Sequence, residues 1–148
     1  MAVYEHILVA VDFSSAADTV GARAVELSRR FEARLHLIHV VEYLPPLDLA
    51  YEPISTPDWG IDEAELVNVA QQSLEAFARR LGVEDATRDV VVGVPRYEIV
   101  RAAGEHEADL IVIGSHGRHG LGRLLGSTAN GVLHSAPCDV LAVRLQEE

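Results

Sequence analysis

Hydrophobic and polar positions follow two alternating patterns along the chain. Short, largely apolar segments, typical of strands covered on both faces of a sheet, occur five times. They cover residues 6–12, 34–42, 86–93, 108–114 and 138–145. Between most of them, apolar residues recur at three- and four-residue spacing, which predicts amphipathic helices. These helices are expected over residues 14–31, 62–81, 95–107 and about 127–135.

Helix-terminal signals refine these boundaries. Ser15 with Asp18 is typical of a capping pair, and Asp62 with an acidic first turn favours a second helix start. Gly82 is expected to end that helix, since glycine adopts the left-handed conformation common after helix ends. Pro95 is expected in the first turn of the third helix, where proline is tolerated.

The order strand, helix, strand, repeated with helix-length connections, predicts an α/β protein with a five-stranded, mostly parallel sheet and helices on both faces. We expect a single domain over residues 1–148, with a long proline-rich loop at about 43–60. In such sheets ligands bind at the carboxyl ends of the strands, where the winding reverses. The first and fourth strands should flank that point, with Asp12 and Gly114 at their ends.

Composition narrows the classes of function. The 148 residues carry 23 acidic and 12 basic side chains, a formal net charge of -11, which disfavours nucleic-acid binding. Cys138 is the only cysteine, so a disulfide framework within the chain is excluded. No apolar run approaches the roughly 20 residues of a membrane span. We therefore expect a soluble, cytoplasmic protein without membrane insertion.

The most informative stretch is DLIVIGSHGRHGLGRLLGSTANGV, residues 109–132, in which glycines follow a strand and precede a helix. Glycine lets a ligand approach the backbone, and successive N–H groups can converge on an anion. A helix that begins at Gly126, Ser127 and Thr128 adds unpaired N–H groups and hydroxyls, which suits a phosphate. The alternative is a connector whose arginines face water. The Gly-Lys-Ser/Thr of a P-loop is absent, as is the dinucleotide fingerprint.

Several segments, taken in order, resemble the universal stress protein family. They are HILVAVDFS, LHLIHVVE, DLIVIGSHGRHG and LLGSTANGVLHSAPCDVLAVR. The resemblance implies a Rossmann-like three-layer sandwich of the adenine nucleotide alpha hydrolase type, with strand order 3-2-1-4-5. It also implies a homodimer paired through the last strand. In one branch of the family it implies ATP as ligand, with Mg²⁺ as its companion ion.

That ATP-binding branch has the pattern Gly, two residues, Gly, nine residues, Gly, then Ser or Thr. Gly114 and Gly117 match its first part, and Gly126 with Ser127 matches its last part. Only eight residues, 118–125, separate the two parts. One residue is worth up to about 3.3 to 3.6 Å of chain, enough to move one phosphate-facing N–H. A second branch lacks the glycines and is not expected to hold nucleotide.

The resemblance also assigns candidate binding residues. Residues expected near the base and adenosine are Ala10, Val11, Asp12, Val40 and Ile113. Residues expected near the ribose and phosphates are Gly114, His116, Gly117, Arg118, Gly126, Ser127 and Thr128. The residues alone leave alternatives open: Asp12 can instead cap the following helix, and Val40 and Ile113 can be plain sheet core.

Neither a metal site nor a catalytic residue is predicted. His116 and His119 are three apart but have no neighbouring carboxylate or thiol, and His36 and His39 point to opposite faces of one strand. The leading hypothesis is a homodimeric ATP-binding module of the stress response that signals to an unknown protein partner. The alternatives are a dimeric scaffold that binds no nucleotide and, below it, a slow nucleotide hydrolase that uses Asp12 or His116.

Overall fold

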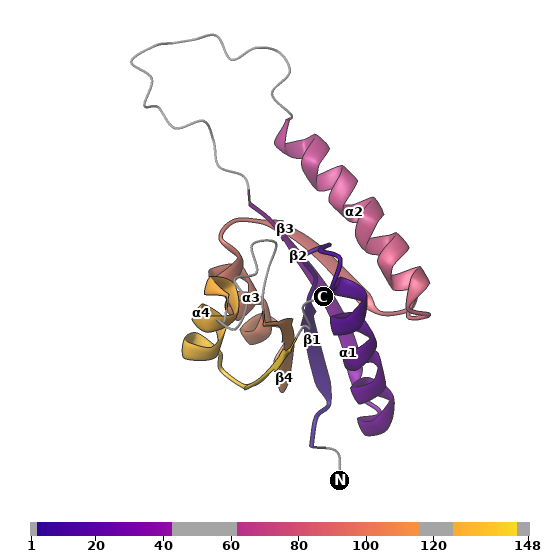
Figure 1. Cartoon of the computed structure of the whole chain (residues 1–148), viewed down its shortest axis with the longest axis vertical. Coiled ribbons are helices and arrows are strands. Elements are labelled where there is room, and N and C mark those ends of the chain that lie inside the picture. The colour runs from indigo at the N-terminus through magenta and orange to yellow at the C-terminus, as the bar shows by residue number, and fades with distance from the viewer. Residues whose placement is uncertain (1–2, 43–61, 116–125, 145–148) are drawn as a thin grey trace.

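A computed structural model describes residues 3–42, 62–115 and 126–144. Strands and helices alternate along this part of the chain, with all five strands in one sheet (Figure 1). The elements are β1 (His6–Ala10), α1 (Ala17–Phe31), β2 (Arg34–Val41), α2 (Glu63–Arg80), β3 (Thr87–Val92), α3 (Pro95–Glu105), β4 (Leu110–Gly114), α4 (Ser127–Ser135) and β5 (Asp139–Val143). The strand order is β3-β2-β1-β4-β5 and every pair is parallel, so the predicted fold class and strand order are confirmed.

The sheet lies between two layers of helices (Figure 1). Helices α1 and α2 cover one face, and α3 and α4 cover the other. The central strand β1 contributes side chains to the cores on both faces of the sheet. Ile7 and Val9 pack toward α1 and α2, while Leu8 packs toward α3 and α4. Each of these side chains is buried to 1% exposure, and burying one stabilises the fold by about 1.5–3 kcal/mol. Their continuous apolar run therefore reflects a strand covered on both sides.

The helix starts agree only in part with the sequence. The predicted Ser15–Asp18 cap is wrong: α1 begins at Ala17, and Ala16 occupies the capping position without a side-chain hydrogen bond. Asp18 instead pairs with Arg80 at 2.9 Å, because a partner from α2 competes for its carboxylate. Asp62 does cap α2, accepting from the Ala64 N–H at 3.4 Å.

Two further end signals are confirmed. Gly82, just beyond α2, has a φ of 72°, in the left-handed region that favours glycine. Pro95 occupies the first turn of α3, which ends at Glu105. Strand β1, in contrast, ends at Ala10 and is shorter than the predicted 6–12, because after one more hydrogen bond from the Val11 N–H to β2 the chain enters a turn at Asp12. The predicted loop at about 43–60 lies outside the described residues.

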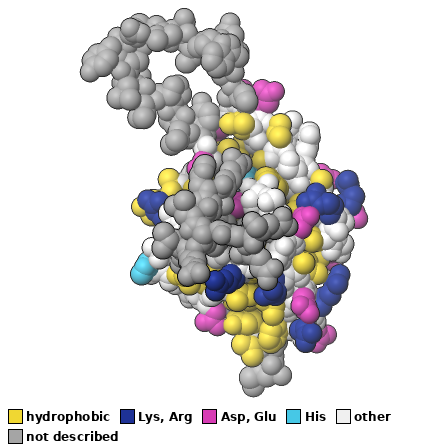
Figure 2. Space-filling view, in the orientation of Figure 1, with side chains coloured by type: hydrophobic (Ala, Val, Ile, Leu, Met, Phe, Trp, Pro, Cys, Tyr) yellow, Lys and Arg dark blue, Asp and Glu magenta, His cyan; other side chains and the backbone are white. Residues whose placement is uncertain are grey.

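Charged side chains of both signs lie along one flank of the surface. Figure 2 shows acidic and basic side chains interspersed along the flank of the molecule that α1 and α2 form. Ion pairs on this flank join Arg30 to Glu26 and Arg80 to Asp18.

In the ranges that the structure covers, no helix has both the length and the apolar character needed to cross a bilayer.

Candidate ligand site at the carboxyl edge of the sheet

The winding of the chain reverses between β1 and β4. These strands are paired in parallel with Val9 opposite Val112, yet the chain reaches β2 on one side of β1 and β4 on the other. The strands end at Ala10 and Gly114, so the polar segments that follow them lie at the same edge. The predicted reversal of the winding between the first and fourth strands is thus confirmed. Such a switch point is where open α/β sheets bind ligands.

The turn after β1 is held by Asp12. Its carboxylate Oδ1 accepts a hydrogen bond of 2.9 Å from the Ser14 N–H. This contact falls before α1 begins at Ala17, so it stabilises the turn and does not cap the helix. The side chain is half-buried at the carboxyl edge of the sheet. Asp12 therefore lies at the carboxyl edge, where the sequence predicted it. Its hydrogen bond supports the turn after β1 and is not a helix cap.

Two aromatic rings that the sequence analysis did not single out for this edge also fix that turn. The Nδ1–H of His39 donates to the Val11 carbonyl oxygen at 2.6 Å, and the His39 ring stacks on Phe13 with 4.2 Å between centroids. Phe13 has a φ of 58°, a left-handed conformation that costs free energy in a residue with a large side chain. No single-sequence signal marks a positive φ at a phenylalanine. The stacked pair compensates part of that cost.

The predicted base-contacting residues divide between the two faces of the sheet. Val40 and Ile113 are buried to 8% and 5% exposure in the core beneath α3 and α4, and half-buried Ala10 packs against the same cluster. The Val11 side chain lies in the opposite core, and its N–H donates to the Ile38 carbonyl at 2.8 Å. Ala10, Val40 and Ile113 thus lie on the face of the sheet that α3 and α4 cover, whereas Val11 lies on the opposite face.

The end of β4 and the start of α4 are joined directly. The Gly126 N–H donates to the Ser115 carbonyl oxygen at 2.7 Å, and the Ser115 N–H donates to the Val143 carbonyl at 2.9 Å. Gly126 therefore lies against the carboxyl edge, although residues 116–125 intervene in the sequence. The predicted contacts His116, Gly117 and Arg118 belong to that segment, outside the described residues.

Helix α4 presents its amino end at the same edge. Gly126 is its N-cap and supplies no side-chain hydrogen bond, and the first turn holds no acidic residue. Among the residues that the structure describes, no side chain caps this turn, so its N–H groups can donate to an anion, with the positive end of the helix dipole behind them. Ser127 is exposed and Thr128 is half-buried, so both hydroxyls stand beside the open end. The geometry suits a phosphate.

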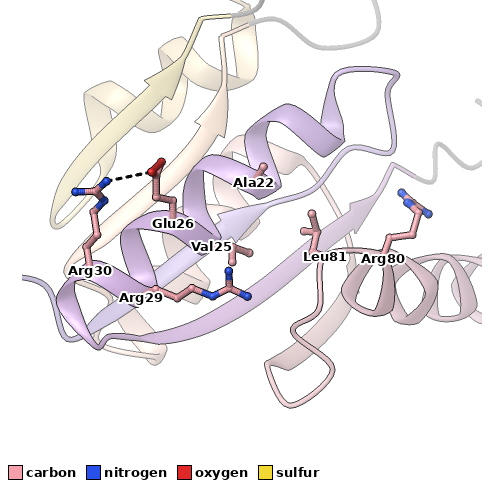
Figure 3. Close-up of a pocket in the computed structure, with 7 residues that line it drawn as sticks. All are labelled: Ala22, Val25, Glu26, Arg29, Arg30, Arg80 and Leu81. Carbon is pink, nitrogen blue, oxygen red and sulfur yellow. Dashed lines mark hydrogen bonds and ion pairs between the residues drawn. The ribbon is translucent and has the colours of Figure 1, made fainter.

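A hollow lies away from this edge, between α1 and the end of α2 (Figure 3). Its polar lining is mainly three arginines, Arg29, Arg30 and Arg80, with Glu26 between them. Arg30 pairs with Glu26 at 3.3 Å, and Arg80 pairs with Asp18 at 2.9 Å. Two of the three guanidinium groups are thus already engaged, and the carboxyl edge remains the better candidate.

The fold defines a class of protein: parallel, doubly wound α/β domains whose winding reverses between the first and fourth strands. Comparison with known proteins gives the family. The model of the universal stress protein family matches residues 3–144. Universal stress protein A homolog 2 of Coxiella burnetii is 41% identical over 145 residues, which cover 97% of each chain. The chain belongs to the universal stress protein family, as its sequence motifs indicated.

Two solved structures of similar fold contain adenine nucleotides. One is a universal stress protein in complex with cAMP, with 26% identity, a TM-score of 0.65, and coverage of 95% of this chain and 96% of that one. The other is the universal stress protein of Archaeoglobus fulgidus in complex with dAMP, with 25% identity, a TM-score of 0.63, and coverage of 95% and 98%. Adenine nucleotides are therefore ligands within this group of structures.

Proposed function

We propose that this protein is an adenine-nucleotide-binding module that takes ATP, with Mg²⁺, at the carboxyl edge between β1 and β4. One observation carries the proposal: the Gly126–Ser115 hydrogen bond holds the amino end of α4, which no side chain of the described residues caps, beside the end of β4. The phosphates would accept from the first-turn N–H groups of α4 and from the hydroxyls of Ser127 and Thr128. The cAMP and dAMP complexes of relatives support the adenine part of the ligand.

The remaining proposed contacts follow the same edge. Asp12 would lie by the adenosine, and Ala10, Val40 and Ile113 would border the base from the face of α3 and α4. Gly114, with Gly117, His116 and Arg118 of the following segment, would face the ribose and phosphates. Mg²⁺ would be held mainly by phosphate oxygens and water, which is how this ion usually binds beside a nucleotide.

The test begins with the protein as purified. Small molecules released on denaturation are identified by mass spectrometry, and ATP with Mg²⁺ is then titrated into the stripped protein by calorimetry. We expect saturable binding of ATP. Absence of any released nucleotide, together with no heat and no thermal shift at millimolar ATP, would contradict the proposal.

A matched pair of glycine variants locates the site. Gly117→Val is expected to abolish ATP binding without unfolding the domain, because a branched side chain would fill the approach of the phosphates. Gly104→Val is the control, since a Cβ at Gly104 meets nothing within 4 Å and this exposed residue lies in α3. Unchanged ATP affinity in Gly117→Val would mean that the ligand binds elsewhere.

One observation favours a second candidate function. The eight residues between Gly117 and Gly126 are one fewer than in the ATP-binding branch, and a shorter segment can withdraw one phosphate contact. The protein would then be a dimeric scaffold of the same fold.

Both candidates share a proposed homodimer through β5, which is an edge strand of the sheet and so offers unpaired backbone groups. Light scattering during size-exclusion chromatography should give twice the mass of the chain.

A further inference from the structure

A cluster of two histidines and one aspartate forms on the opposite side of the molecule from the proposed nucleotide site. His36 is near the start of β2, Asp89 is in β3, and His106 follows the last residue of α3. The strands run parallel, so the start of β2 belongs to the amino edge of the sheet. His36 and Asp89 lie on the sheet face that α3 covers, because the neighbouring Ile38 belongs to the core beneath that helix.

The three side chains converge on one point. Asp89 Oδ2 lies 3.1 Å from His36 Nε2 and 3.3 Å from His106 Nε2. The three potential ligand atoms all lie within 4.8 Å of one another. Ligands placed about 2.0–2.2 Å from a tetrahedral zinc ion are separated by roughly 3.3–3.5 Å. The two separations are close to that edge length. The His36 and His106 rings are stacked with 3.9 Å between centroids, so an ion would require the rings to turn out of this stack.

From this geometry we infer that His36, Asp89 and His106 form a binding site for a divalent ion of the zinc class. Two imidazole nitrogens and one carboxylate oxygen are a donor set that zinc accepts. Three protein ligands leave a fourth position for water. The side chains of His106 and Asp89 are 39% and 49% exposed, so that position is open to solvent. His36 and His106 also line a cavity of about 750 Å³ at this edge.

The surroundings of His36 prepare it as a ligand. Its Nδ1 is hydrogen-bonded to the Thr87 hydroxyl, the residue opposite it in β3. A partner on Nδ1 fixes the orientation of the ring, as hydrogen bonds to metal-bound histidines generally do, while Nε2 faces Asp89 Oδ2.

A positive ion is also favoured by its place in the fold. His106 is the C-cap of α3, where the negative end of the helix dipole lies. Glu105 and Glu107 flank His106 in the sequence, and the chain carries a net charge of -11. An ion here would link β2, β3 and the end of α3. In the sequence, Asp89 is 53 residues from His36 and 17 residues from His106.

The site is tested with Co²⁺ alone, which reports tetrahedral coordination through its visible absorption. Chelator-treated full-length protein is titrated with CoCl₂, and bound Co²⁺ is then displaced with Zn²⁺. We expect one equivalent of Co²⁺ to bind with a tetrahedral spectrum. Asp89→Asn and His106→Gln should each weaken binding by at least about tenfold, a loss of the size seen when metal-site partners are removed. Both residues are exposed enough for the variants to fold, which circular dichroism checks.

Two controls separate this cluster from other histidines. His134→Gln, an exposed residue in α4, should bind Co²⁺ like the parent protein. The double variant His116→Gln with His119→Gln should do the same. Loss of the Co²⁺ spectrum in that double variant would place the ion elsewhere and overturn the proposal. Absence of binding at 100 equivalents of Co²⁺, or parental affinity in both Asp89→Asn and His106→Gln, would overturn it as well.

Discussion

The backbone N–H of Gly126 donates a 2.7 Å hydrogen bond to the carbonyl oxygen of Ser115. This contact holds the first turn of α4 against the end of β4, whatever path residues 116–125 take between them. The amino end of a helix thereby lies at the carboxyl edge of the sheet, the edge at which Asp12 follows β1. This hydrogen bond links the fold to the proposed function. A phosphate at the amino end of α4 would accept from backbone N–H groups that no side chain of the described residues caps.

The length of the segment before Gly126 can be tested directly. Insertion of one glycine after Gly122 restores nine residues between Gly117 and Gly126. If eight residues already permit the phosphate contacts, we expect ATP affinity within about threefold of the parent, less than 1 kcal/mol. Calorimetry measures the change. A gain of tenfold or more would instead support the scaffold alternative, with the natural segment too short for ATP.

Asp12 has a measurable structural role that is independent of any ligand. Asp12→Ala removes the acceptor of the Ser14 N–H and should lower the free energy of unfolding by about 1 kcal/mol. Asp12→Asn keeps an oxygen acceptor at that position and should cost less than half as much. Urea denaturation without nucleotide measures both variants. Equal losses in the two would show that charge, not the turn hydrogen bond, is what the carboxylate contributes.

The contact between α1 and α2 predicts opposite effects at two helical glycines. A Cβ at Gly21 would lie 2.6 Å from Leu81 Cδ1 and 2.7 Å from the Phe77 ring. Gly21→Ala should therefore destabilise the protein by about 1–3 kcal/mol, since overpacking outweighs the helix propensity of alanine. Gly104→Ala meets no such neighbour and should stabilise it by up to about 1 kcal/mol. Thermal unfolding of the pair gives the comparison, and a stabilised Gly21→Ala would contradict the packing.

The contribution of Asp109 to the free energy of unfolding depends on pH. Its Oδ2 accepts from the Glu5 N–H at 2.7 Å and the His6 N–H at 2.9 Å, and these bonds lower the pKa of the carboxyl. Because the folded pKa is below the unfolded one, the carboxylate stabilises the protein above the unfolded value of 3.8. That contribution is lost as pH falls further.

The measurement is the difference in melting temperature between parent and Asp109→Ala from pH 6 to pH 3. The difference should be largest near pH 6 and shrink at the acid end, because only the parent has this contribution to lose. The other carboxyl groups titrate in both proteins and cancel in the comparison. A difference that stays constant across this range would contradict the assignment.

Local pattern sufficed for much of the fold. The apolar runs predicted β1 and β4 as buried strands, and helix-length connections made the sheet parallel. The ends were less predictable where partners came from elsewhere in the chain. Ser15 and Asp18 have the residue types of a cap, yet Asp18 is held by Arg80 of α2. A residue's type limits its choice of partners, but only packing selects among them.

By itself, the sequence determined the alternation of strands and helices, and with it the carboxyl edge where Asp12 and Ser127 belong. These features follow from periodicity and connection length, which are local properties of a chain. Only the tertiary structure decided that His36, Asp89 and His106 converge. The register between β2 and β3 and the end point of α3 set those contacts. Both depend on how distant elements pack together, which neither spacing nor composition records.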